Sequence, residues 1–189
     1  MDAFEELVAE LFRAKGFWVQ RNVKIDLTLA EKRDLNNPSM PRPEIDLVAY
    51  QPASNILMAI ECKSYLDSQG VHVRDLKPGG RYGRRYKMFT DAVLRNLVLK
   101  NLVEQFTARR MLQGNPEVRL ALVYGKGVPS AEPELTEYFE DRGWQLYGPE
   151  WLCRCLVTMA NQPYDNQMAS IVAKLLLKTR NASSQSVLA

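Results

Sequence analysis

Two short apolar segments, each interrupted by charge, constrain this chain more than any other feature of its sequence. Residues 43–48 read Pro-Glu-Ile-Asp-Leu-Val, and residues 59–63 read Ala-Ile-Glu-Cys-Lys. Both are typical of β-strands, in which successive side chains point to opposite faces. Glu61 and Lys63 are therefore expected on one face of their strand. With Asp46 on a strand beside them, they would form a cluster of two carboxylates and one ammonium group.

Burying such a cluster is costly unless the charges are paired or a metal ion compensates them. A metal-dependent hydrolytic site is therefore the first hypothesis. The alternative is an exposed pair, because surface strands often carry Glu and Lys two residues apart, where the pair contributes little. Residues 55–60, Asn-Ile-Leu-Met-Ala-Ile, are nearly all apolar, which is typical of a strand buried on both faces. This context favours the functional interpretation.

The two segments resemble the motif of the PD-(D/E)xK nucleases, which have the restriction-endonuclease-like fold. Asp46 stands at the acidic position, and Glu61-Cys62-Lys63 matches the E-x-K element. Residues 4–12 are similar to the helix that carries a further glutamate in this family. Gly16-Phe17 is similar to the helix-to-strand turn of its Mrr-like and archaeal junction-resolvase branches. The resemblance spans about residues 4–125. One departure is Ile45, which stands where the motif has proline.

Helical geometry selects one glutamate on that first helix. Its apolar residues recur at the i, i+3, i+4, i+7 and i+8 spacing of a helix packed on a sheet. At 100° per residue, Glu5 lies roughly 90° from the centre of the apolar face, while Glu6 and Glu10 lie farther round. Only Glu5 is therefore expected to lean towards the sheet. An alternative stays open, because Asp2 and Glu5 also have the spacing of a capping box.

The resemblance implies a magnesium-dependent nuclease, with Mn²⁺ able to substitute for Mg²⁺. Asp46 and Glu61 would hold the ion, a hard cation that prefers oxygen ligands. The backbone carbonyl of Cys62 would join them, and Glu5 would bind directly or through water. Lys63 would orient or help to deprotonate the attacking water and stabilise negative charge. Burial would lower the pKa of Lys63 and its acidic neighbours would raise it, and the sequence leaves that balance open.

The order of the predicted elements agrees with an α/β fold that has a restriction-endonuclease-like core. The expected order is helix, three strands, helix and strand, giving a mixed sheet flanked by helices with extra C-terminal helices. The predicted ranges are a helix at 2–15, a strand at 17–29, a loop at 30–42, the two charged strands, a helix at 90–113 and a strand at 118–124.

Three parts of the chain are expected. Residues 1–127 would form the nuclease-like core, and 128–180 a C-terminal helical extension packed on the same domain. Residues 181–189 would form a flexible tail. Within the extension, the pattern predicts a short edge strand at 144–147 and a last amphipathic helix at 166–178.

A basic segment follows Lys63 and is expected to form a flexible loop at the mouth of the site. Lysine and arginine displace the counterions of a phosphate backbone, and tyrosines between them can stack on bases. The alternative is a solvated basic loop. Because the whole chain carries a net charge of only +3, DNA affinity would come from this local segment. Its predicted nucleic-acid-binding residues are Arg74, Lys77, Arg81, Arg84, Arg85 and Lys87.

Composition sets the remaining bounds. A chain of 189 residues, 46% of them hydrophobic, can bury one proper core. No apolar run approaches the ~20 residues of a membrane span, the N-terminus is unlike a signal peptide, and a cytoplasmic location is expected. A single histidine disfavours histidine-based metal sites and Ser-His-Asp triads. We expect DNA as a partner and, for cutting both strands, a homodimer.

Two further interpretations remain open. A structure-specific resolvase would use the same residues but would prefer branched DNA to linear duplex. A catalytically silent DNA-binding module would keep the fold and the basic segment without the chemistry.

Overall fold

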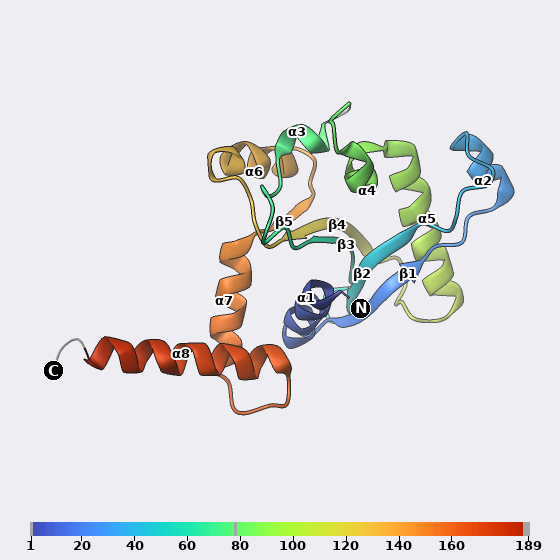
Figure 1. The fold of residues 1–189 in the computed structure, drawn as a ribbon. Coiled ribbons are helices and arrows are strands. Elements are labelled where there is room, and N and C mark those ends of the chain that lie inside the picture. The colour runs from blue at the N-terminus through green and yellow to red at the C-terminus, as the bar shows by residue number, and fades with distance from the viewer. Residues whose placement is uncertain (1, 78, 187–189) are drawn as a thin grey trace.

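A five-stranded mixed sheet forms the centre of the computed structural model, which describes residues 2–77 and 79–186. The strands lie in chain order, and each pairs with the next. β1 to β3 pair antiparallel, whereas β3, β4 and β5 pair parallel. Helices flank the sheet (Figure 1), so the predicted mixed α/β class is confirmed. The strands are β1 (Trp18–Lys24), β2 (Glu44–Gln51), β3 (Ile56–Lys63), β4 (Glu117–Tyr124) and β5 (Gln145–Tyr147).

Helices cover both faces of this sheet. One face packs against α1 (Ala3–Ala14) and α7 (Pro149–Ala160). The other packs against α5 (Ala92–Ala108), α6 (Glu132–Glu140) and a group of short helices. These short helices are α3 (Val73–Leu76), η1 (Gly83–Tyr86) and α4 (Lys87–Thr90); η2 (Pro129–Ala131) precedes α6.

The central strand β3 is buried on both faces, as its apolar sequence predicts. Leu57 and Ala59 belong to the core on the α5 side, and Met58 and Ile60 to the core on the α1 side. A strand enclosed in this way places any charged side chain near its end in a poorly solvated position.

Two sequence predictions near the N-terminus need correction. The strand predicted at 17–29 ends at Lys24, one residue before the Ile25 N–H donates to the Pro43 carbonyl oxygen at 2.8 Å. The pairing goes no farther because the opposite segment carries prolines, which have no backbone N–H to donate. The segment predicted as a loop at 30–42 contains helix α2 (Leu29–Asp34). A complete capping box, in which Thr28 and Glu31 satisfy each other's backbone N–H groups, starts this helix despite its polar, proline-flanked surroundings.

Two predictions in the middle of the chain also need correction. The helix predicted at 90–113 is shorter, because Asp91 caps it at the start and Arg110 turns the chain with φ 58° soon after its end. The segment predicted as a basic loop contains α3, η1 and α4, held by Tyr86, which is almost completely buried.

The C-terminal third adds to the same sheet and core. The edge strand predicted at 144–147 is confirmed as β5, which pairs with β4. Helix α8 (Met168–Ser186) packs against α7 and projects away from the body (Figure 1). It extends into the predicted tail at 181–189, of which residues 187–189 lie outside the described part of the chain. In that described part, no helix combines the length and hydropathy that a bilayer crossing requires.

Candidate active site

The backbone pairing of β2 and β3 stops where the charged residues begin. The last paired residues are Leu47 and Ile60. The next backbone N–H group of β3 that points towards β2 belongs to Cys62. This group donates to Oδ2 of Asp46 at 2.8 Å, so a side chain replaces the missing strand partner. A residue in an antiparallel ladder directs its N–H and C=O to the same neighbour. The Cys62 carbonyl oxygen therefore also faces the gap beside Asp46.

Glu61 and Lys63 lie on one face of β3, as the alternation predicts. The Lys63 Nζ donates to Glu61 Oε1 at 2.5 Å, and the two side chains are only 18% and 16% exposed. This pair is therefore mostly buried, which excludes the interpretation as an exposed surface pair.

The carboxylates of the cluster resist ionisation. Burial raises the pKa of Glu61, against the opposing attraction of Lys63, and Asp46 raises it further. Burial also raises the pKa of Asp46, although the Cys62 N–H and Lys63 oppose the shift. One ammonium group cannot neutralise several buried carboxylates, so each acid disfavours the charge of the next.

The structure gives the direction of the Lys63 pKa shift, which the sequence left open. Burial alone would lower its pKa, but the attraction of Glu61 and Asp46 is stronger, and the pKa is raised. Lys63 is therefore a protonated hydrogen-bond donor at neutral pH in this arrangement.

Glu5 lies beside the same cluster, at the N-terminal end of α1. Its pKa is raised by burial and by the charge of Asp46. The other two glutamates have different partners: Glu6 pairs with Arg13 and Arg21, and Glu10 accepts the backbone N–H of Ala169. Of the three, Glu5 is the one directed towards Asp46.

The capping-box alternative for Glu5 is met only in part. Asp2 accepts the backbone N–H groups of Phe4 and Glu5 at 2.8 and 3.3 Å, so it is the N-cap. The Glu5 carboxylate instead accepts a hydrogen bond from Asn22, across the strand.

Asn22 and Glu44 belong to the site although the sequence did not single them out. The Asn22 Nδ2 donates to Glu5 at 3.3 Å and to Glu44 at 3.2 Å. Asn22 stands opposite Asp46, between two paired residues of the β1–β2 ladder. Its left-handed φ turns the side chain out of the strand alternation. An asparagine within a strand-like run was the available signal, since asparagine adopts this conformation more readily than most residues.

The donors at this end of the sheet suit a hard divalent cation. Asp46, Glu61 and the Cys62 carbonyl offer only oxygen atoms, the ligand type that Mg²⁺ prefers. Within residues 2–77 and 79–186, no three histidine, cysteine, aspartate or glutamate side chains gather closely enough to hold a metal by themselves. Magnesium commonly keeps several waters and uses one or two carboxylates, so this smaller set still fits it.

The structure divides the six predicted DNA-binding residues among separate surfaces. Lys77 pairs with Glu134 at 2.8 Å, and it shares one hollow with Arg84 and Lys87. A different hollow contains Arg74 and Arg85. Arg81 and Arg85 both stack on the ring of Tyr82, at 5.3 and 4.9 Å from its centroid.

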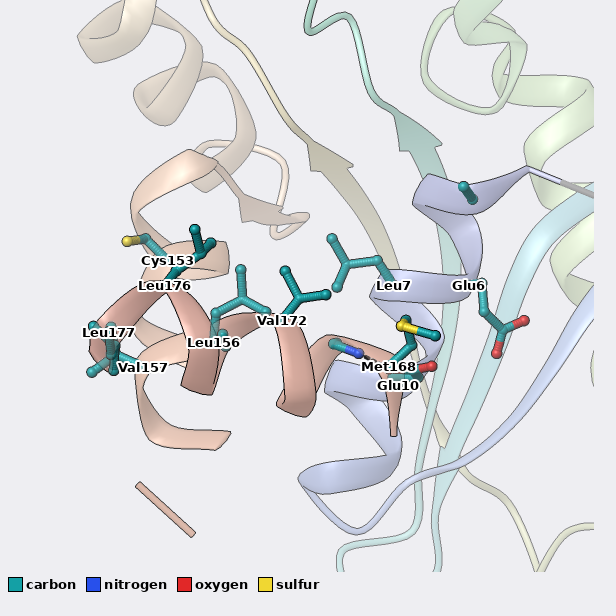
Figure 2. Close-up of a pocket in the computed structure, with 13 residues that line it drawn as sticks. Glu6, Leu7, Glu10, Cys153, Leu156, Val157, Met168, Val172, Leu176 and Leu177 are labelled. Carbon is teal, nitrogen blue, oxygen red and sulfur yellow. Dashed lines mark hydrogen bonds between the residues drawn. The ribbon is translucent and has the colours of Figure 1, made fainter. Parts of the chain in front are cut away.

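A large hollow lies away from this charged site. It has a volume of about 600 Å³ and lies between α1, α7 and α8, where mainly apolar side chains face one another (Figure 2). None of Glu5, Asp46, Glu61 and Lys63 lines it.

Comparisons with known proteins give neither a family nor a function for this chain. No protein-family model matches the sequence, and no curated protein matches it. Among solved structures, the chain is similar to a protein of unknown function, AF1548, at 14% sequence identity and a TM-score of 0.44. The alignment covers 86% of this chain and 71% of that one. Because the TM-score is below 0.5, this likeness assigns neither a family nor an activity.

Proposed function

We propose that this protein is a magnesium-dependent endonuclease that hydrolyses phosphodiester bonds in DNA, with Mn²⁺ as an alternative ion. One observation carries the proposal: Asp46, Glu61 and Lys63 lie together, mostly buried, where β2 and β3 separate. Charged groups whose pKa values are shifted by burial and by one another are typical of catalytic sites.

The chain topology supports the same proposal. Apart from the short helices α2, α3, η1 and α4, the chain order is α1, three antiparallel strands, α5 and a strand β4 that pairs parallel with β3. This is the helix, three strands, helix, strand order of the restriction-endonuclease-like core, which we propose as the fold. The C-terminal third then adds the strand β5, the helices α6, α7 and α8 and the short helix η2 to that core.

Each residue would have a distinct task in hydrolysis. Asp46, Glu61 and the Cys62 carbonyl would hold the cation, and Glu5 would bind it directly or through water. When bound, a divalent cation polarises a phosphate oxygen and activates water. Lys63, protonated and only two residues from Glu61, would donate to the scissile phosphate and stabilise its developing charge. Asn22 would hold Glu5 in place through its side-chain amide.

The substrate would reach this site past the basic segment. Arg74, Arg81 and Arg85 lie on the segment that follows β3, and the guanidinium groups of Arg81 and Arg85 contact the ring of Tyr82. Phosphate contacts from arginine position DNA without reading its sequence. The other three basic residues, Lys77, Arg84 and Lys87, lie around a separate hollow and would contact a more distant part of the backbone.

Cleavage of supercoiled plasmid tests the proposal. Wild-type protein with Mg²⁺ or Mn²⁺ is expected to nick and linearise the DNA, whereas Asp46→Asn and Glu61→Gln are expected not to. The matched control is Glu117→Gln, a glutamate two residues from a cation on the neighbouring strand. Failure of the wild type on supercoiled, linear, single-stranded and four-way DNA would contradict the proposal. A marked preference for four-way DNA would favour the resolvase, and binding without cleavage the silent module.

A second copy of this chain is the proposed occupant of the apolar hollow. Large side chains of α8 are solvent-exposed along one stripe, including Leu175 at 59%, Leu176 at 64% and Met168 at 67%. An apolar stripe that is left exposed on a helix is typical of a surface that contacts another protein. Since α8 projects from the body (Figure 1) and the hollow lies at its base (Figure 2), two copies could exchange these surfaces about a twofold axis. Two sites per dimer would then serve the two DNA strands.

Sedimentation equilibrium tests this dimer. Wild type is expected as a dimer and Leu176→Glu as a monomer, because a carboxylate would be buried in the interface. The control Lys178→Glu changes an exposed residue of α8 that does not line the hollow, and it should remain dimeric. A monomeric wild type at micromolar concentration would overturn the assignment, and it would leave the cleavage chemistry untouched.

A further inference from the structure

A small polar pocket lies beside the candidate active site, between the segment that follows β3 and helices α3 and η1. Its volume is about 160 Å³, and Tyr65, Arg74, Asp75, Tyr82, Arg85 and Tyr86 contribute to its walls. We call it the Asp75 pocket. Tyr65 connects it to the catalytic cluster, because this residue follows Lys63 by only two positions and lines the pocket.

Asp75 is the unusual residue of this pocket. It is only 5% exposed, and among the described residues no group donates a hydrogen bond to its buried Oδ1. A buried acceptor without a partner costs free energy of folding. Its position is nevertheless fixed by close backbone packing, since a Cβ atom added at Gly80 would lie 2.4 Å from the Arg74 carbonyl oxygen and 2.9 Å from the Asp75 Cα. The fold therefore holds a free acceptor at the wall of a pocket.

The other walls are aromatic and cationic. Tyr86 is almost fully buried, and it lines this side of the pocket together with Tyr65. Tyr82 is 38% exposed, with the guanidinium groups of Arg81 and Arg85 over its ring. A flat ring would find an aromatic surface here, and an attached phosphate would find arginine.

The size of the pocket limits its occupant. A cavity of about 150 Å³ in another protein accommodates one benzene ring, so the Asp75 pocket has room for about one heteroaromatic base and not for a base pair. A base can enter such a pocket only after leaving the stack of a duplex, or from a strand that is already unpaired.

We propose that the Asp75 pocket binds one unpaired nucleobase that carries an exocyclic amino group, next to the phosphodiester bond to be cut. The amino group donates to Asp75 Oδ1, the ring packs against tyrosine, and Arg74 and Arg85 contact the flanking phosphates. Cytosine fits this description, because its N4 amino group is a natural donor to a carboxylate. Thymine presents a carbonyl oxygen at the same position, which the carboxylate repels. The inference rests on the proposed action on DNA and adds a preference for substrates with an unpaired base.

Binding measured without metal separates this inference from catalysis. Fluorescence anisotropy in EDTA would compare labelled duplexes that are fully paired, that contain one unpaired cytosine, or that contain one unpaired thymine. Wild type is expected to bind the cytosine bulge about tenfold more tightly than the thymine bulge, the size typical of one polar base contact. Lys63→Ala should retain this preference although it should cut DNA much more slowly.

Asp75→Asn tests the acceptor directly. It keeps the shape of the side chain and is expected to lose the cytosine preference, while its affinity for the paired duplex stays at the wild-type level. The control Asp67→Asn removes an exposed carboxylate of the same segment and should keep the preference. Should Asp75→Asn fail to fold by circular dichroism, Tyr82→Ala replaces it and should weaken binding of both bulges but not of the duplex.

Equal affinity of wild type for the two bulges would overturn the inference, and so would a cytosine preference that survives in folded Asp75→Asn. A cytosine preference in a protein that cuts no DNA would keep the pocket and remove the nuclease. Cleavage of plasmid without any bulge preference would support the nuclease and overturn the pocket.

Discussion

Two glutamate–cation pairs on neighbouring strands have the same sequence spacing but differ in their exposure to solvent. Glu61 and Lys63 occupy β3, and Glu117 and Arg119 occupy β4, each pair two residues apart and joined by a short hydrogen bond. The side chains of the first pair are 16% and 18% exposed, whereas those of the second are 60% and 34% exposed. The two pairs therefore share a sequence pattern but not an environment.

Their position along the strands causes the difference. In the parallel register, Glu117 lies opposite Ile56 at the start of β3, while Lys63 lies opposite Tyr124 at the end of β4. Only the second end is surrounded by the acids Asp46 and Glu5. The pKa of Glu61 is accordingly raised, chiefly by burial, whereas the hydrogen bond from Arg119 lowers the pKa of Glu117. Burial and neighbouring acids, and not the motif letters, distinguish the two pairs.

Removing the basic side chain of each pair should have the largest effect on cleavage. This effect should also differ most between the two pairs. Lys63→Ala is expected to lower plasmid cleavage about 10²–10³-fold, because it removes a preorganised donor to the developing charge. Arg119→Ala should leave cleavage unchanged, because its pair is exposed and contributes little. Initial rates of nicking with Mg²⁺, for variants with the wild-type circular dichroism spectrum, measure both. Similar losses in the two variants would place the site elsewhere.

Magnesium should stabilise the protein by binding beside the Glu61–Lys63 pair, and it should not bind at the Glu117–Arg119 pair. An ion at 100 times its Kd stabilises the folded state by about 2.7 kcal/mol, and each kcal/mol raises the Tm of a protein of this size by about 2–4 °C. The Tm of wild type and of Glu117→Gln should therefore rise by several degrees with MgCl₂. Asp46→Asn should not respond, although its amide oxygen can still accept the Cys62 N–H. A response that persists in Asp46→Asn would contradict this ligand set.

The cluster of Asp46, Glu61 and Lys63 could be predicted because it depends on short-range rules. Strand alternation places Glu61 and Lys63 together, and the apolar run before them indicates burial on both faces. The selection of Glu5 over Glu6 and Glu10 followed from helical geometry in the same way. The structure places all four charged groups at one end of the sheet.

The parts that could not be predicted depend on backbone conformation or on tertiary packing. Asn22 reaches Glu5 only because its φ is left-handed, and the alternation rule gives no sign of that. The division of Arg74 and Arg85 from Lys77, Arg84 and Lys87 depends on how α3 and η1 fold against each other. Helix α2 is different, since Thr28 and Glu31 carried a readable capping box in a segment whose prolines favoured a loop.

Asn22 should have a smaller effect than Lys63, because it acts by positioning Glu5. Asn22→Gly keeps the left-handed backbone without strain and removes only the side-chain amide. We expect cleavage to fall about tenfold, as for other residues that orient metal ligands, with KM for DNA unchanged and the Mg²⁺ concentration needed for half-maximal rate increased. Asn36→Gly, at another left-handed asparagine in the turn after α2, is the control and should match wild type. Loss of folded protein in Asn22→Gly alone would make the role of Asn22 structural.

The pH dependence of stability should show the smallest difference between the two pairs. The pKa values of Glu5, Asp46 and Glu61 are raised in the folded protein, so the folded state binds more protons than the unfolded state just above the ordinary carboxyl range. Stability in EDTA should therefore increase as the pH falls from neutral towards that range, with a gain in Tm of about 2 °C. Glu61→Gln should reduce the gain, since it removes a titrating group from the cluster. Glu117→Gln should keep it, because the lowered pKa of Glu117 places its titration at more acidic pH. Melting curves measured by circular dichroism from pH 7.5 downwards test this prediction. A Tm that falls steadily with pH in all three proteins would contradict it. The acids at the β3 end would then be ionised in the folded protein at no cost in stability.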